Sequence, residues 1–257
     1  MHLEGSVDIS QSSVFRIIQP LLKDLPAPSL QNLLALYARA AQQGDDASQH
    51  SIDGLTRITP DEGLELLRLA KNSQANSLLE VGLAYGFSSQ FLLSALYPLG
   101  GRLISIDPYQ SSEWHGIGRR LAIHTAQALT VDLGSEEPLR FECLEDRSDL
   151  ALPQLNSQGE SFDMIFIDGS HRFDDVLIDV TMSVHLCREG GLIVLHDLLM
   201  PSVRTVVGFL EANRVDLLRE PTPCWNLAVF RRLGNDPRDS NHFIPFSATS
   251  RIVTQVA

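Results

Sequence analysis

The chain has 257 residues, of which 44% are hydrophobic and 20% are charged, a balance typical of a soluble globular protein with a sizeable core. Its 32 acidic residues outnumber the 20 Lys and Arg residues, and the formal net charge of −12 disfavours nucleic acid or an anionic membrane as a partner. The three cysteines form no C-x-x-C pair, and neither a signal-like N-terminus nor a membrane-length apolar run is visible, so we expect a cytoplasmic protein of one main domain.

Residues 1–58 are predicted to form a helical N-terminal segment. Apolar residues recur in it at helical spacing, and prolines are expected to break the helices at Pro20, Pro26 and Pro28. The polar stretch 44–54 is typical of a loop. We expect the segment to cover a ligand site or to form a subunit interface in a homo-oligomer.

Residues 59–235 carry the pattern of one α/β domain. A helix begins after Thr59, whose hydroxyl can cap it, and Asp61 and Glu62 follow at the positive end of the helix dipole. Short apolar runs then alternate with helical runs, which indicates a doubly wound, parallel sheet covered by helices on both faces. The predicted strands are 77–82, 102–107, 139–144, 162–168 and 191–197, and the predicted helices are 59–72, 88–97, 118–129, 174–187 and 203–213.

Two further apolar runs, 215–220 and 226–232, complete a seven-stranded sheet. The proline-rich turn between them is too short for a helical crossover, so we expect this pair to be antiparallel at one edge. The predicted fold class is therefore α/β, with a mostly parallel seven-stranded sheet and a final antiparallel edge strand. Residues 236–257 are expected to form a C-terminal tail.

The predicted helix 174–187 begins with acidic residues. Asp174 and Asp175 suit its positive N-terminal end. Asp179, about one turn later, is expected on a solvated face of the helix.

The stretch LLEVGLAYGFSS (78–89) predicts a strand, a tight turn and the start of a helix. Gly82 and Gly86 stand where the backbone must turn sharply and let a ligand come close. The spacing lacks the middle glycine of the dinucleotide pattern, so a pyrophosphate has less room here. Glu80 and Asp107, which ends the next strand, add negative charge. The sequence therefore favours a cationic ligand, with a ribose that Asp107 can bind.

Acidic residues also end two later strands. A carboxylate is disfavoured inside a sheet, so Asp168 and Asp197 are expected at the mouth of a crevice beyond the strand ends. Two carboxylates on adjacent strands, roughly 5 Å apart, either raise one pKa or hold a cation, and hard oxygen ligands suit Mg²⁺. His171 follows Asp168 by three residues and His196 directly precedes Asp197, so both imidazoles are candidates for the same opening.

Four motifs in order carry a resemblance to a known family. EVGLAYGFSS, the acid at Asp107, FIDGSH and GGLIVLHD together resemble the class I S-adenosylmethionine (SAM)-dependent methyltransferases. Within that family they are similar to the small-molecule O-methyltransferases of the catechol and macrolide-sugar types, over about residues 60–235. The resemblance implies a Rossmann-like fold, SAM as the cofactor, and methyl transfer to a hydroxyl of a small-molecule acceptor such as a sugar or secondary metabolite.

The resemblance also implies a role for individual residues in binding the cofactor. Gly82 and Gly86 would pass under its methionine and ribose, and Asp107 would bind the ribose. Ser88 would lie near the methionine carboxylate, although it could equally cap the helix. The full set of cofactor-binding residues implied in this way is Glu80, Gly82, Tyr85, Gly86, Ser88, Asp107, Asp146, Arg147 and Asp168. Asp146 and Arg147 would contact adenine, with a solvated loop as the alternative.

A third set of roles concerns the reaction. By resemblance, Asp168 and Asp197 would bind Mg²⁺ and His171 would act as the general base. The chain has His196-Asp197 where the catechol-type enzymes have Asp-Asn and the sugar enzymes have Asp-Asp. His196 is therefore a candidate for a third metal ligand or for a second base. Because imidazole is a less natural ligand for Mg²⁺ than a carboxylate, the sequence leaves open whether a metal binds at all. Three alternatives remain: a small-molecule N-methyltransferase, a nucleotide-dependent oxidoreductase, and a non-catalytic SAM-binding module.

Overall fold

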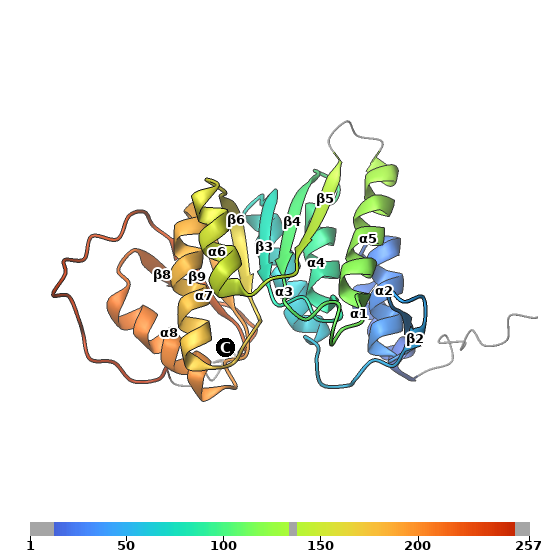
Figure 1. Ribbon diagram of the computed structural model, residues 1–257, viewed down its shortest axis with the longest axis horizontal. Helices are drawn as coiled ribbons and strands as arrows, with labels where there is room; N and C mark the ends of the chain where they lie inside the picture. The colour runs from blue at the N-terminus through green and yellow to red at the C-terminus, as the bar shows by residue number, and fades with distance from the viewer. Residues whose placement is uncertain (1–12, 134–137, 250–257) are drawn as a thin grey trace, which may run out of the picture.

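A computed structural model describes residues 13–133 and 138–249. Its centre is a seven-stranded sheet with the order β5-β4-β3-β6-β7-β9-β8 (Figure 1). The strands are β3 (Ser77–Val81), β4 (Gly101–Ile106), β5 (Leu139–Leu144), β6 (Phe162–Ile167), β7 (Cys187–Leu195), β8 (Leu217–Glu220) and β9 (Ala228–Arg232). The first five are parallel, as predicted. The chain reverses its direction of travel across the sheet between β3 and β6, which is where such sheets bind ligands.

The last two strands form the expected antiparallel pair at one edge. Strand β9 lies between β7 and β8 and is antiparallel to both, so β8 is the outermost strand. The mostly parallel seven-stranded α/β sheet predicted from the sequence is thereby confirmed.

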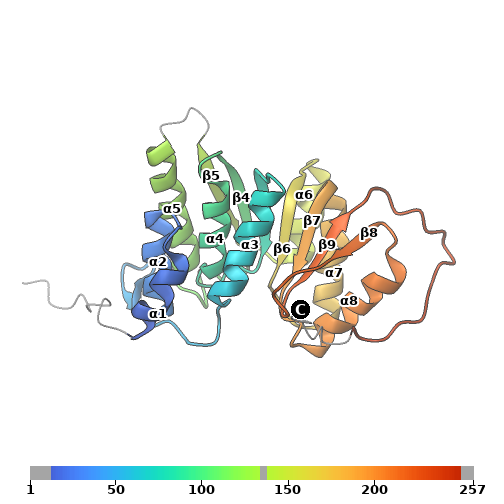
Figure 2. The same ribbon diagram turned by 180° about the vertical axis from the view of Figure 1, so that it is seen from behind.

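Helices cover both faces of the sheet. Helices α6, α7 and α8 lie on the face in front in Figure 1, and α3 lies in front in Figure 2, where the view is from behind. Each face has its own hydrophobic cluster, and neighbouring residues along a strand alternate between them: Leu78 belongs to one cluster and Leu79 to the other. The helices are α1 (Ser13–Leu22), α2 (Ala27–Tyr37), α3 (Pro60–Asn72), α4 (Phe87–Leu96), α5 (Ile117–Leu133), α6 (Ser148–Ser157), α7 (Phe173–Leu186) and α8 (Pro201–Asn213). None of the helices within the described ranges is long and apolar enough to cross a membrane.

The start of α3 is capped as predicted. The Thr59 hydroxyl accepts a hydrogen bond from the Glu62 backbone N–H at 3.3 Å, and the Glu62 carboxylate accepts one from the Thr59 N–H at 2.6 Å. This capping box fixes the position of Glu62, whose other carboxylate oxygen faces the interior.

Some local features differ from the predictions. Pro20 lies inside α1 and Pro28 lies in the first turn of α2, so the helices break only between Leu22 and Ala27. Pro28 is tolerated because the first N–H groups of a helix have no intrahelical acceptor. The stretch 44–54, expected as a loop, contains the strand β2 (Gln49–His50), which forms a small hairpin with β1 (Gln42–Gln43) just before it. Helix α6 was not predicted, because its sequence is polar and contains Pro153.

Candidate functional site

A cavity of about 790 Å³ opens at the carboxyl ends of the central strands. It is lined by residues that end or follow four different strands: Gly82 after β3, Asp107 after β4, Asp168 after β6 and Asp197 after β7. The N-terminal segment contributes Leu55 to Ile58 to the wall. This volume is within the usual range for a ligand site, and is enough for a nucleoside cofactor beside a small second molecule.

The two glycines of the β3–α4 turn answer different steric demands. Gly82 has a φ of +95°, and a Cβ there would lie 2.2 Å from the Asp168 carbonyl oxygen. Gly86 has a φ of +83° and is the N-cap of α4, packed against the backbone of Gly118. Gly82 lines the cavity and Gly86 does not. The tight approach of β3 to β6 therefore requires Gly82, whereas Gly86 serves the helix start and its packing.

Asp107 holds the same turn from the neighbouring strand. Its Oδ2 accepts hydrogen bonds from the backbone N–H groups of Leu83 (3.1 Å) and Ala84 (2.7 Å), and from the Gln110 side chain (3.1 Å). Its Oδ1 accepts one from the Tyr109 N–H at 2.9 Å. The side chain is only 4% exposed. Asp107 thus has few acceptor positions left, all on Oδ1, for the predicted ribose contact.

Glu80 lies beneath the turn and is fully buried. Its carboxylate accepts hydrogen bonds from the hydroxyls of Ser88 (2.5 Å), Ser89 (2.6 Å) and Ser105 (2.5 Å). Burial raises the pKa of Glu80 to about 7, against the lowering effect of the three hydroxyls. Glu80 does not line the cavity, and the Ser88 hydroxyl donates to Glu80 instead of capping α4. These contacts favour a role for both residues in fixing the turn.

Of the two residues expected near adenine, only Arg147 lines the cavity. Asp146 accepts a hydrogen bond from the Arg147 N–H at 2.7 Å and does not line the cavity. Arg147 does line it, but its guanidinium makes two hydrogen bonds to Asp149, at 2.9 and 2.7 Å. Tyr85 also lines the cavity, with its ring edge-on to Trp114 at 5.1 Å between centroids.

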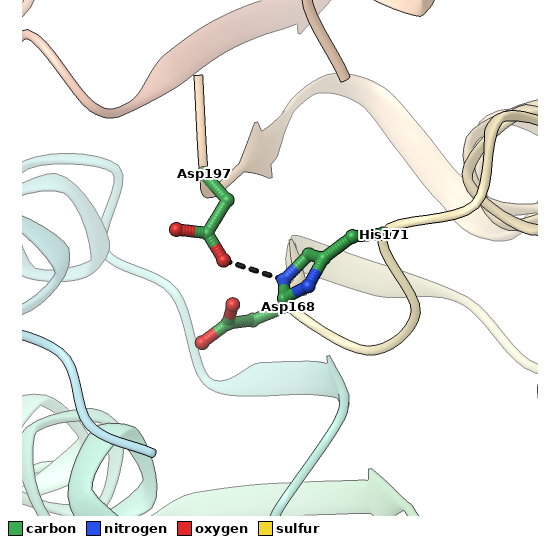
Figure 3. Close-up of side chains that lie close together, drawn as sticks. All are labelled: Asp168, His171 and Asp197. Atoms are coloured by element: carbon green, nitrogen blue, oxygen red, sulfur yellow. Dashed lines mark ion pairs between the residues drawn. The ribbon is translucent and has the colours of Figure 1, made fainter. Parts of the chain in front are cut away.

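Three of the predicted reaction residues meet at one corner of the cavity (Figure 3). The His171 Nε2 lies 2.5 Å from the Asp197 Oδ2, and the nearest ligand atoms of Asp168, His171 and Asp197 are all within 4.8 Å of one another. The hydrogen bond to Asp197 raises the pKa of His171, against the effect of burial. Asp197 has a φ of +60°, a left-handed conformation that costs energy in a non-glycine residue and is enriched at functional sites.

His196 also lines the cavity, next to Asp168, but it is almost fully buried. It is 6% exposed, with Nδ1 2.9 Å from the Asp168 Oδ1 and Nε2 3.4 Å from the Glu62 Oε2. The amide nitrogen of Asn226 lies 3.2 Å from the same Nε2. Burial alone would lower the pKa of His196, but the surrounding carboxylates, Asp168 first, raise it to about 12. Both ring nitrogens have partners, so the arrangement does not favour His196 as a metal ligand or as the base.

The sequence reasoning missed two residues of this network. Glu62 was assigned only to the positive end of the helix dipole, and Asn226 was assigned no role. Asn226 donates to the Glu62 Oε1 at 3.0 Å and its own Oδ1 accepts from the Leu199 N–H at 3.1 Å. No local motif signals these contacts, because they join the starts of α3 and β9 to the end of β7.

The β3–α4 turn and the strand-end acids Asp107, Asp168 and Asp197 all lie in a part of the chain that matches a known protein family. Residues 79–198 match the model of a family described as a methyltransferase domain. The chain carries a methyltransferase domain.

Relatives and solved structures agree with this identification. A protein of Mycobacterium ulcerans, provisionally named an O-methyltransferase, is 29% identical over 177 residues, which cover 66% of this chain and 71% of the relative. A catechol O-methyltransferase of Niastella koreensis is 28% identical over 166 residues, covering 61% and 62%. The crystal structure of the O-methyltransferase TomG from Streptomyces achromogenes, in complex with SAM, covers 87% of this chain and 97% of its own, with a TM-score of 0.61 and 21% identity. The predicted Rossmann-like fold and the resemblance to SAM-dependent methyltransferases are therefore confirmed.

The corner of the methyltransferase cavity has a donor set that fits a divalent cation. Asp168, His171 and Asp197 each offer one ligand atom within a sphere that a single ion can span. Two carboxylates and an imidazole are a mixed oxygen and nitrogen set, which suits transition metals better than Mg²⁺. The third residue of this set is His171, whereas the sequence suggested His196.

Proposed function

We propose that this methyltransferase transfers the methyl group of SAM to a hydroxyl of a small molecule. The observation that carries the proposal is the His171–Asp197 pair, which stands at the cavity wall beside Asp168 and can remove the proton of an acceptor hydroxyl. The names of the relatives from Mycobacterium ulcerans and Niastella koreensis support an oxygen acceptor. A nucleotide-dependent oxidoreductase is left without a supporting observation.

The cofactor supplies an electrophilic methyl group on a sulfonium. The chain supplies the orientation: Asp107 and Glu80 fix the β3–α4 turn on which the cofactor would lie, and Gly82 leaves room above it. Walls of Tyr109, Trp114 and Met200 surround the remaining space.

His171 would act as the general base through one defined nitrogen. Because Nε2 faces Asp197 at 2.5 Å, its N–H donates to that carboxylate and Nδ1 remains free to accept a proton. Asp197 then stabilises the imidazolium that forms. Burial works to raise the pKa of Asp197, but the hydrogen bonds from His171 and His196 outweigh it and lower the pKa, so Asp197 stays ionised.

A metal-assisted reaction is the second candidate, favoured by the proximity of Asp168, His171 and Asp197. A divalent cation held there would act as a Lewis acid that lowers the pKa of the acceptor hydroxyl. The two candidates assign different roles to His171, as ligand or as base, and a chelator separates them.

The decisive experiment measures methyl transfer from tritium-labelled SAM to a panel of matched hydroxyl and amine acceptors. We expect hydroxyl compounds to be methylated, and we expect His171→Ala to lower kcat by about 10²–10⁴-fold while leaving the affinity for S-adenosylhomocysteine (SAH) unchanged. His124→Ala is the matched control, because His124 is an exposed histidine on α5 outside the cavity. Full activity of His171→Ala, or faster methylation of the amines, would contradict the proposal.

Two further measurements sharpen the assignment. Since His171 must be neutral to act as a base and its pKa is raised, kcat/KM is expected to fall as the pH drops through a value above the ordinary histidine pKa of about 6.5. Activity that survives EDTA supports the base, whereas loss that Mn²⁺ restores supports the metal.

A further inference from the structure

One buried acid in the cavity wall has no structural task that explains it. Asp179 of α7 is 1% exposed and lines the cavity, and its Oδ1 has no hydrogen-bond partner among residues 13–133 and 138–249. The sequence predicted a solvated position for it, and that prediction was wrong. A buried carboxylate oxygen without a partner is costly, so it is rare unless a ligand or water supplies the missing donor.

The other acids on this wall already have partners. Asp149 is bound by the Arg147 guanidinium, and Asp175 accepts hydrogen bonds from Arg172 (2.8 Å) and Ser170 (2.6 Å). Asp179 lies on the same helix as Asp175, one turn further along and deeper in the wall. Its unmatched oxygen is therefore distinct from the paired acids at the rim.

The position of Asp179 relative to the sheet indicates what the missing donor is. Helix α6 begins at Ser148, soon after Leu144, which is paired with Ile106 at the end of β4. Ser148 and Asp179 both line the cavity, and α6 packs on α7, so Asp179 lies beside the β5–α6 turn. The predicted ribose residue, Asp107, directly follows Ile106. A nucleoside whose ribose lies at Asp107 can thus extend its base toward Asp179.

The surroundings suit a flat base with a polar edge. Ile106 and Ile178 also line the cavity and offer apolar surface to the faces of a ring. Adenine carries an exocyclic amino group with two N–H donors, and a carboxylate oxygen is its natural acceptor. We propose that Asp179 accepts a hydrogen bond from the exocyclic amino group of the cofactor and so selects adenine over a deaminated base.

This inference rests on the proposed function, because it takes the nucleoside to be that of SAM. Burial raises the pKa of Asp179 to about 6, so part of the population is protonated near neutral pH. A protonated carboxyl also donates, and adenine places a ring-nitrogen acceptor next to its amino group. The ionised carboxylate discriminates between the bases, because the O6 of hypoxanthine would face its oxygen with another acceptor, whereas a protonated carboxyl can pair with either base. The binding measurements below are therefore made at pH 8.

The test compares the binding of SAH and of its deaminated analogue, S-inosylhomocysteine, by titration calorimetry. The wild-type protein is expected to bind SAH at least about tenfold more tightly, in line with one hydrogen bond to a buried charged group. Asp179→Leu should weaken SAH by a similar factor and abolish the preference. Asp179→Asn keeps an oxygen acceptor for adenine, but its amide can rotate to offer an N–H to the O6 of hypoxanthine, so it should keep SAH binding and lose most of the preference. Asp175→Asn, one turn away with partners of its own, is the matched control and should keep the wild-type preference.

Each outcome decides the inference. Equal affinities in the wild type, or a preference that survives in Asp179→Leu, would overturn it and leave an internal water as the partner of Asp179. Circular dichroism of each variant separates loss of recognition from loss of folding, and Asp179→Asn tests the idea if Asp179→Leu does not fold. Absence of SAH binding in the wild type would overturn the cofactor itself, which distinguishes that failure from failure of the Asp179 assignment.

Discussion

The two sides of the cavity differ in how completely their carboxylates are hydrogen-bonded. Under the β3–α4 turn, Glu80 accepts from three serine hydroxyls and Asp107 from three backbone N–H groups and one amide. On the opposite side, Asp179 has an oxygen without a partner, and Asp168 and Asp197 face imidazoles at the cavity surface. Saturated acids fix the backbone, whereas acids with open positions remain available to ligands.

This difference bears on how each side responds to change. Removing a saturated carboxylate leaves buried donors without an acceptor, so the fold is affected together with binding. Removing a carboxylate that has an oxygen without a hydrogen-bond partner relieves charge repulsion or the cost of desolvation in the free protein. Such a change is expected to lower mainly the affinity for the ligand. The predictions below test this contrast, beginning with the side where the expected effect is largest.

Asp107→Ala is expected to have the largest effect. It leaves the N–H groups of Leu83, which is buried, and of Ala84, which is half-buried, without their acceptor, at a cost of about 1–3 kcal/mol for the buried group and less for the other. We expect the free energy of unfolding to fall by about 2–5 kcal/mol and SAH binding to weaken by about 100-fold or more. Urea unfolding and calorimetry measure the two effects.

The matched control is Asp146→Ala, since Asp146 is exposed and holds only the N–H of the next residue. Its free energy of unfolding should stay within about 0.5 kcal/mol of the wild type. If the urea concentration at the unfolding midpoint is the same for Asp107→Ala as for the wild type, the two sides of the cavity do not differ in the way described.

Asp179→Asn tests the opposite side and should stabilise the free protein. Burial raises the pKa of Asp179 from its ordinary 3.8 to about 6, so ionisation opposes folding. The folded state holds the proton more tightly, and the wild type therefore loses stability as the pH rises from about 4 to 6. At pH 8 the penalty is fully present, and removing the charge should raise the free energy of unfolding by up to about 3 kcal/mol.

The gain should shrink as the pH falls through 6 and vanish below about 4, where the carboxyl becomes protonated in both states. Urea unfolding at a series of pH values follows this trend. Asp175→Asn should show no such gain, because the hydrogen bond from Arg172 lowers the pKa of Asp175. A gain at pH 8 that persists unchanged at pH 4 would show that repulsion or desolvation of the Asp179 charge is not its cause.

The fold and the main acids of the site were predictable because their signals are local. Strand ends at Asp107, Asp168 and Asp197 are marked by the switch from an apolar run to an acid, and the order of motifs fixed the topology. Gly82 was predicted as a tight turn, although the backbone it approaches, that of Asp168, follows only from the fold.

Burial and partners across the sheet were not predictable in the same way. Asp179 and Asp175 look alike in the sequence, yet one is buried and the other is paired at the rim, because only the packing of α7 on α6 separates them. Likewise, His196 looked like a free catalytic histidine until α3 and β9 brought Glu62 and Asn226 to its second nitrogen. Single-sequence periodicity gives no information on which helix face meets which neighbour.

Arg147→Ala is expected to have the smallest effect, and it tests the predicted adenine contact directly. The Arg147 side chain is 65% exposed, and both of its hydrogen bonds go to Asp149. An exposed ion pair of this kind contributes little, and we expect an unchanged Tm and an affinity for SAH within about threefold of the wild type.

A larger loss of SAH affinity in Arg147→Ala would show that the side of the cavity around Asp149 and Asp179 changes when the cofactor binds. If SAH binding weakened by about tenfold or more while the Tm stayed constant, Arg147 would have to leave Asp149 when the cofactor enters. The rim of the cavity would then rearrange on binding, and Asp149 would join Asp179 as an acid with an open position. Repeating the SAH titration with Asp149→Asn tests whether Arg147 leaves Asp149. If the Arg147–Asp149 pair stays intact in the complex, Asp149→Asn should weaken SAH binding as much as Arg147→Ala does. If Arg147 leaves Asp149 to reach the cofactor, Asp149→Asn should bind SAH more tightly than the wild type, because Asp149 no longer competes for the guanidinium.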